Sequence, residues 1–278
     1  MSNPLFNEKR MNEDRAGWAA PVGGASMITH TGGPTSTPID DGPVSSWEKE
    51  AMTVNGTITA TASLFILLLI SATFGWMASS GPTLENGQET FQFPALAVVG
   101  IIVGFVAVIA ASFKPKLAKF LGPVYAIGYG FAVGAISHGY ETFQNGIVLQ
   151  AVGATVAVVV SMLVLYRTRI IKVTDRFRKI VMGATMGIML LYLVSFVISF
   201  FGADIAFINS PSLLGIGFSV LVCGLAAFNL ALDFDLIERG VAQRFPKSYE
   251  WVAALGLLVT IVWLYLELLR LLSKLQQR

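Results

Sequence analysis

Residues 94–113, Pro-Ala-Leu-Ala-Val-Val-Gly-Ile-Ile-Val-Gly-Phe-Val-Ala-Val-Ile-Ala-Ala-Ser-Phe, contain no charged side chain. A helix rises 1.5 Å per residue, so about 20 apolar residues cross the hydrocarbon core of a bilayer. Six further apolar runs of similar length lie at about 58–78, 121–140, 147–166, 180–202, 211–234 and 251–272. The sequence therefore predicts an all-α fold, a polytopic bundle of seven transmembrane helices.

The composition of the chain agrees with a membrane protein. Of its 278 residues, 54% are hydrophobic and 13% are charged, whereas a soluble domain carries about 25% charged residues. The mean hydropathy is +0.68. Because the first apolar run begins only near Ile58, it does not have the position of a cleavable signal peptide, and we expect the first span to be retained.

Residues 1–50 differ from the rest of the chain. They are rich in Gly, Pro, Ser, Thr, Asn and acidic residues and show no apolar periodicity. Such a composition buries too little apolar surface to order itself. We therefore predict two parts, a disordered tail at 1–50 and a transmembrane domain at 51–278.

Basic residues are distributed unevenly between the loops. Three, six and three Lys or Arg residues lie in the loops at 114–120, 167–179 and 236–250. None lies in the loops at 79–93, 141–146 and 203–210. Because Lys and Arg are retained on the cytoplasmic side, the N-terminus is expected inside.

The last span poses a difficulty for this topology. Strict alternation places the chain end outside, together with Arg270, Lys274 and Arg278. Either the span crosses and tolerates these charges, or it is re-entrant and returns inside. We favour crossing, because 22 apolar-rich residues are long enough.

Pairs of glycine four residues apart occur in three of the predicted spans. They are Gly100 with Gly104, Gly130 with Gly134, and Gly183 with Gly187. Small residues at this spacing allow helix backbones to approach closely, so we expect these pairs at helix contacts.

Known soluble catalytic motifs are absent from the sequence. It contains no phosphate-loop, dinucleotide, zinc-protease or nucleophile-elbow pattern. One cysteine and two distant histidines supply no metal-ligand set. We expect neither an enzyme nor a cofactor, and no nucleic-acid partner.

Polar residues within the last two spans are the main candidates for function. In the sixth span, spacings of 4, 3, 3 and 4 place on one helical face Ser219, Cys223, Ala226, Asn229 and Asp233. In the seventh, spacings of 4, 3, 4 and 3 do the same for Gly256, Thr260, Trp263, Glu267 and Arg270. Two polar faces on neighbouring helices, each carrying an acid, are typical of a seam open to water or ions.

The two acids, Asp233 and Glu267, have alternative explanations. An acid at membrane depth costs about 2.5–3.5 kcal/mol on insertion scales, so it lines a pathway or finds a partner. Both also lie near a helix end, where each is able to snorkel to the interface. Glu267 has a possible partner in Arg270, three residues on, and Asp235 has one in Arg239, four residues on.

Antiparallel packing predicts which residues face these acids. It places Asp233 near the Gly256–Thr260 end of the seventh span and away from Glu267. His138 and Glu141, at the expected outer end of the third span, are the predicted neighbours of Glu267.

Several segments resemble the bacterial branch of the Bax-inhibitor family of transmembrane proteins. They are Leu-Asp-Phe-Asp-Leu-Ile-Glu at 232–238, Glu-Trp-Val-Ala-Ala-Leu-Gly-Leu-Leu-Val-Thr at 250–260, Trp-Leu-Tyr-Leu-Glu-Leu-Leu-Arg-Leu-Leu at 263–272, Pro-Val-Tyr-Ala-Ile-Gly-Tyr-Gly-Phe-Ala-Val-Gly-Ala-Ile-Ser at 123–137 and Gly-Ile-Val-Leu-Gln-Ala at 146–151. The resemblance covers about residues 50–275.

The resemblance implies a seven-helix bundle with the last helix central, in the inner membrane of a bacterium. It also implies a pH-sensitive calcium leak gated by two aspartates on helices 6 and 7. Asp233 matches the first aspartate. Val259 or Thr260 falls at the second position, and only the local Leu-Tyr-Leu-acid pattern points to Glu267. The basic residue that some members carry on helix 2 is also missing, because 94–113 is uncharged.

Two functions from different classes follow. The first is a passive, pH-modulated calcium or cation leak. In this function Asp233 is the pH sensor and offers at most a weak calcium site. Asn229 and Thr260 are the oxygen donors beside it, and Glu267 lies further along the pathway. The second is a non-conducting regulator that docks on another membrane protein, such as a membrane-integral ATP-dependent protease. A secondary transporter is disfavoured, since no pair of broken helices is evident.

Overall fold

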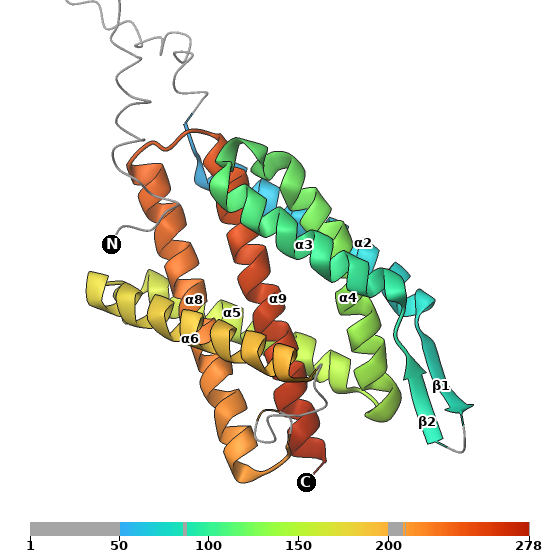
Figure 1. The fold of residues 1–278 in the computed structure, drawn as a ribbon. Coiled ribbons are helices and arrows are strands. Elements are labelled where there is room, and N and C mark those ends of the chain that lie inside the picture. Colours follow the sequence, from blue (N-terminus) through green and yellow to red (C-terminus); the bar gives the residue numbers. More distant parts are fainter. Residues whose placement is uncertain (1–50, 86–87, 200–207, 209, 278) are drawn as a thin grey trace, which may run out of the picture. The chain divides into compact units, whose positions relative to one another are not determined.

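The computed structural model describes residues 51–85, 88–199, 208 and 210–277. In this part, seven helices are long and apolar enough to cross a membrane. They are α2 (Val54–Ala78), α3 (Ala95–Phe113), α4 (Ala118–Phe143, preceded by the 3-10 turn η2, Pro115–Leu117), α5 (Ile147–Arg167), α6 (Asp175–Ser199), α8 (Leu213–Ala242) and α9 (Ser248–Gln276), drawn in Figure 1. Each overlaps one predicted apolar run, so the predicted seven-helix bundle is confirmed; the predicted tail at 1–50 lies outside the described residues.

One segment predicted as a loop contains strands. Residues 79–93 include β1 (Ser80–Glu85) and β2 (Gln88–Gln92), which form an antiparallel hairpin with Thr83 opposite Thr90. Threonine and phenylalanine favour extended backbone, but so short a hairpin leaves little signal beside the long apolar runs.

One end of the bundle is defined by contacts at the start of α2. The backbone N–H of Met52 donates to the Phe245 carbonyl at 2.7 Å. The buried Glu250 carboxylate on α9 accepts from both the backbone N–H and the hydroxyl of Thr53, each at 2.9 Å. We call this the Thr53 end.

The opposite end is defined by the end of α2. There the Ser79 hydroxyl lies 2.7 Å from Nδ1 of His138 on α4, and the Gln144 side-chain amide donates to the Ser273 carbonyl of α9 at 3.1 Å. We call this the Ser79 end. Because α9 has contacts at both ends and no break between them, it crosses the bundle and is not re-entrant.

Helix α9 occupies the centre of the bundle. It contacts α2, α3, α4, α5 and α8, and Figure 1 shows it, in red, between α8 and α4. Its buried side chains include Leu258, Leu264 and Leu269, none of which is exposed to solvent. The central last helix expected from the resemblance is therefore present.

Glycines allow α2, α3 and α4 to pack closely. A Cβ added to Gly134 would overlap the backbone carbonyl of Ala72 on α2, and one added to Gly100 would overlap that of Gly128. By contrast, no described atom lies within 4 Å of a Cβ added to Gly183 or Gly187 on α6. The predicted packing role holds for the glycine pairs on α3 and α4 and is wrong for the pair on α6 within this chain, because α6 lies at the periphery.

Candidate functional site: a polar seam along α8

The two predicted polar faces meet between α8 and α9, and α6 joins them. Asp233 faces Gly256 and Thr260, while Ser219 bonds to Lys274, so the two antiparallel helices keep one register. Fourteen residues separate the two contacts on each helix, which corresponds to about 21 Å. We call this line of polar residues the seam.

At its Thr53 end, the seam contains the half-buried Asp233. Its Oδ1 lies 3.7 Å from the position that a Cβ on Gly256 would take, and the carboxylate faces Thr260, whose hydroxyl donates to the Gly256 carbonyl at 3.1 Å. Oδ2 is buried and has no hydrogen-bond partner among the described residues. The predicted pairing of Asp233 with the Gly256–Thr260 end of the last span is therefore correct.

In the middle of the seam, Asn229 joins α8 to α6. Its side-chain amide donates to the Thr185 hydroxyl at 2.8 Å and to the Leu225 carbonyl at 2.9 Å. Both donors of the amide group are used, and its carbonyl oxygen accepts no hydrogen bond from the part of the chain that the structure describes.

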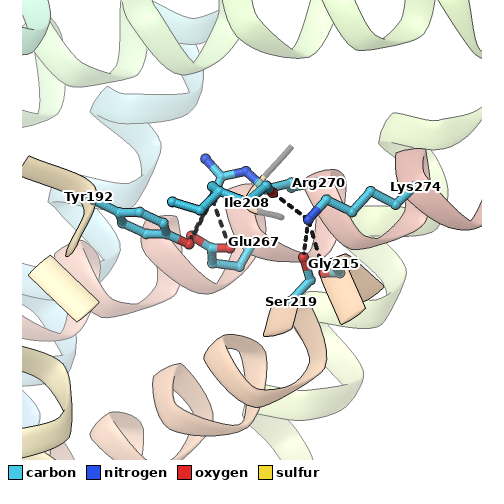
Figure 2. Close-up of polar contacts among 7 residues, drawn as sticks. All are labelled: Tyr192, Ile208, Gly215, Ser219, Glu267, Arg270 and Lys274. Carbon is cyan, nitrogen blue, oxygen red and sulfur yellow. Dashed lines mark hydrogen bonds and ion pairs between the residues drawn. The ribbon is translucent and has the colours of Figure 1, made fainter. Parts of the chain in front are cut away.

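Glu267 lies further along the seam and is 2% exposed, so it does not snorkel. Its carboxylate oxygens lie 3.0 and 3.1 Å from Nη1 of Arg270, and the Tyr192 hydroxyl of α6 donates to it at 2.9 Å. Arg270 Nη1 also donates to the Tyr192 oxygen at 2.8 Å. Figure 2 shows these three side chains converging.

The predicted ion pair of Glu267 with Arg270 is present, but its other predicted neighbours are wrong. His138 lies against the Trp76 ring and bonds to Ser79, and Glu141 accepts from the backbone N–H groups of Gly146 and Val148. His138 is engaged at the end of α2, and Glu141 is engaged at the turn into α5, where it satisfies free N–H groups of the helix start.

The Ser79 end of the seam contains Lys274, which is 3% exposed. Its ammonium donates to the Ile208 carbonyl at 2.6 Å, the Gly215 carbonyl at 3.0 Å and the Ser219 hydroxyl at 2.8 Å. Together with Arg270 in its pair, this explains why these charges fit the predicted topology poorly. Lys274 is buried, Arg270 is partly buried in its ion pair, and both belong to helix α9 and not to a loop.

The family model described as Bax inhibitor 1 like matches residues 3–277. The chain belongs to this family. No curated protein matches the chain. Membership agrees with the resemblance found in the closing helices and, with the seven apolar helices, establishes an integral membrane protein.

In this Bax inhibitor 1 like protein, the residue of α9 that faces Asp233 is not an acid. The α9 residue that faces Asp233 is Thr260, a neutral hydroxyl, and Glu267 lies about 10 Å further along the helix. Among the described residues, no three His, Cys, Asp or Glu side chains come together as a metal site would require. The seam therefore combines one carboxylate with neutral oxygens at the Thr53 end.

Sequence reasoning missed the contribution of α6. Thr185 and Tyr192 are seven residues apart and so share a helical face, which is the signal that was available. Arg178, one turn into α6, pairs with Asp235 at 3.0 Å, beside the predicted Asp235–Arg239 pair at 2.7 Å. These contacts make α6 the third wall of the seam.

Proposed function

We propose that this protein is a passive, pH-modulated calcium or cation leak whose path follows the seam. The observation that carries the proposal is the buried Oδ2 of Asp233, which has no hydrogen-bond partner among the described residues. An ionised carboxylate buried in this way is costly unless a proton or a cation joins it. Asp233 is then the group through which pH acts on the pathway.

The remaining seam residues have supporting roles. Asn229 and Thr260 offer neutral oxygens beside Asp233, and Glu267 holds α6 against α9 through Tyr192 and Arg270. Calcium takes six to eight oxygen ligands, so this inventory favours weak transit over tight binding. No enzymatic step and no cofactor is part of the proposal, and the Thr53 end is assigned to the cytoplasm of a bacterial inner membrane.

Calcium flux into liposomes that contain only the purified protein tests the proposal. We expect flux above that of empty liposomes, with a rate that changes with pH. Asp233→Asn, which mimics the protonated acid, should show the acid-side rate at every pH. Asp235→Asn is the matched control, because Asp235 is paired with Arg178 and Arg239, and it should retain the pH response.

A second candidate is a non-conducting regulator that docks on another membrane protein, such as a membrane-integral ATP-dependent protease. It is favoured by the exposed glycine pair at 183 and 187 on α6, because such pairs pack helices together. This candidate predicts no flux above empty liposomes at any pH. If the correctly folded protein passes no calcium in liposomes, the leak is rejected in favour of the regulator.

A further inference from the structure

Lys274 is a buried cation held entirely by neutral oxygens among the described residues. An ammonium has three N–H donors, and each has an acceptor, from Ile208, Gly215 and Ser219. We call these three oxygens the oxygen cage. Figure 2 shows the ammonium reaching toward all three.

The inward direction of the Lys274 side chain is informative. Lysines near the end of a membrane helix ordinarily extend toward the interface and keep their charge in water. Lys274 lies in the last turn of α9, where that route is short, yet it is 3% exposed and points to α8. The oxygen cage compensates for the loss of hydration, since each oxygen lies 2.6 to 3.0 Å from the nitrogen.

The oxygen cage lies at one end of the seam. Ser219 belongs to the polar face of α8 that continues to Asn229 and Asp233, while the ammonium comes from α9. The contact therefore joins the two helices that border the seam. A cation that travels along the seam from Asp233 meets a fixed positive charge at the Ser79 end.

We propose that the oxygen cage is a cation site for a primary ammonium or an alkali-metal ion, occupied by the Lys274 ammonium, which closes the Ser79 end of the seam. Three neutral oxygens suit a monovalent cation better than calcium, which prefers more ligands and carboxylates. The binding part of the proposal stands on the geometry alone. The closing role rests on the proposed leak.

Chemical replacement of the lysine side chain tests the binding part. Lys274→Ala removes three methylenes and the ammonium, which n-propylammonium replaces atom for atom. We expect the purified Lys274→Ala protein to show a saturable rise in melting temperature, of roughly a few degrees, as n-propylammonium is added. Two control proteins should show no such rise with n-propylammonium: wild type, and Lys247→Ala, which alters an exposed lysine at the start of α9. The neutral analogue n-propanol should not raise the melting temperature of Lys274→Ala.

Flux measurements test the closing role. In liposomes buffered equally on both sides, Lys274→Ala should raise calcium flux several-fold over wild type, and n-propylammonium should return it to the wild-type rate. Lys247→Ala should leave the flux unchanged. If Lys274→Ala does not fold, Ser219→Ala, which removes one cage oxygen, should raise the flux in the same direction by a smaller factor.

The two parts fail in different ways. An equal response of melting temperature to n-propylammonium and n-propanol would overturn the cation site. A saturable ammonium response without flux in any variant would support the site and overturn both the leak and the closing role. Flux that is present in wild type and unchanged in Lys274→Ala would overturn the closing role while the leak stands.

Discussion

A double-mutant cycle on Glu267 and Arg270 measures how strongly the seam is held together. Glu267 is 2% exposed, and Nη1 of Arg270 and the Tyr192 hydroxyl both donate to its carboxylate. Removing one member of a buried pair costs about 3–5 kcal/mol. The Arg270 side chain is 33% exposed, so water screens its stranded charge, and we expect Glu267→Gln to destabilise the protein by about 2 kcal/mol.

The double variant separates the pair from the packing around it. Replacing both partners, as in Glu267→Gln with Arg270→Met, leaves no stranded charge, so its loss should be smaller than the sum of the single losses by about 1–2 kcal/mol. Unfolding in detergent micelles with increasing denaturing detergent measures the four proteins. Asp175→Asn removes an exposed partner of Arg178 and should change stability by less than about 0.5 kcal/mol.

The cycle also has a functional outcome. If Glu267 acts by holding α6 against α9, Glu267→Gln should not change the pH response of calcium flux, because that response is assigned to Asp233. Additivity of the single losses within about 0.5 kcal/mol would contradict the coupling that the geometry requires. If the folded Glu267→Gln protein lost the pH response, Glu267 would have to be part of the ion pathway itself.

Three further predictions concern the rest of the bundle. Gly134→Ala should lower stability by about 1–3 kcal/mol in the same detergent assay, because its Cβ would lie 2.6 Å from the Ala72 carbonyl carbon, whereas Gly187→Ala has space and should be neutral or stabilising. Glu250→Gln should speed hydrogen exchange in the first turn of α2, since it removes the charge that accepts from Thr53; unchanged exchange would show that this contact does not order the turn. Single cysteines in the 167–179 loop of a Cys223→Ala background should resist an impermeant reagent added outside cells, and strong labelling would overturn the assigned topology.

The sequence predicted the helices well because their signal is local. A run such as 94–113 has one physical explanation, the bilayer, and the span lengths follow from the rise per residue. The pairing of Asp233 with Thr260 was also predictable, because antiparallel helices fix the register once both ends are known. Glu267 with Arg270 and Asp235 with Arg239 followed from spacing within one helix.

Contacts between helices distant in sequence were harder to predict. Nothing local indicates that Tyr192 reaches Glu267 or that Lys274 turns inward to Ser219, since both depend on how α6 and α8 lie against α9. The glycine pairs illustrate the same limit. Their spacing shows that a helix is able to pack closely, but it does not show whether a partner helix is present. Gly134 packs against α2, whereas Gly187 has no described neighbour at this distance.

The continuity of α9 has a mechanical consequence. This helix runs unbroken from Ser248 to Gln276, so a displacement along its axis moves Thr260 and Lys274 together by the same distance. A slide of one residue, about 1.5 Å, is enough to strain the contact with Asp233 and to withdraw the ammonium from its oxygens at once. If the seam is the proposed leak path, its two ends do not open independently, and protonation of Asp233 would act on Lys274 through about 21 Å of continuous helix.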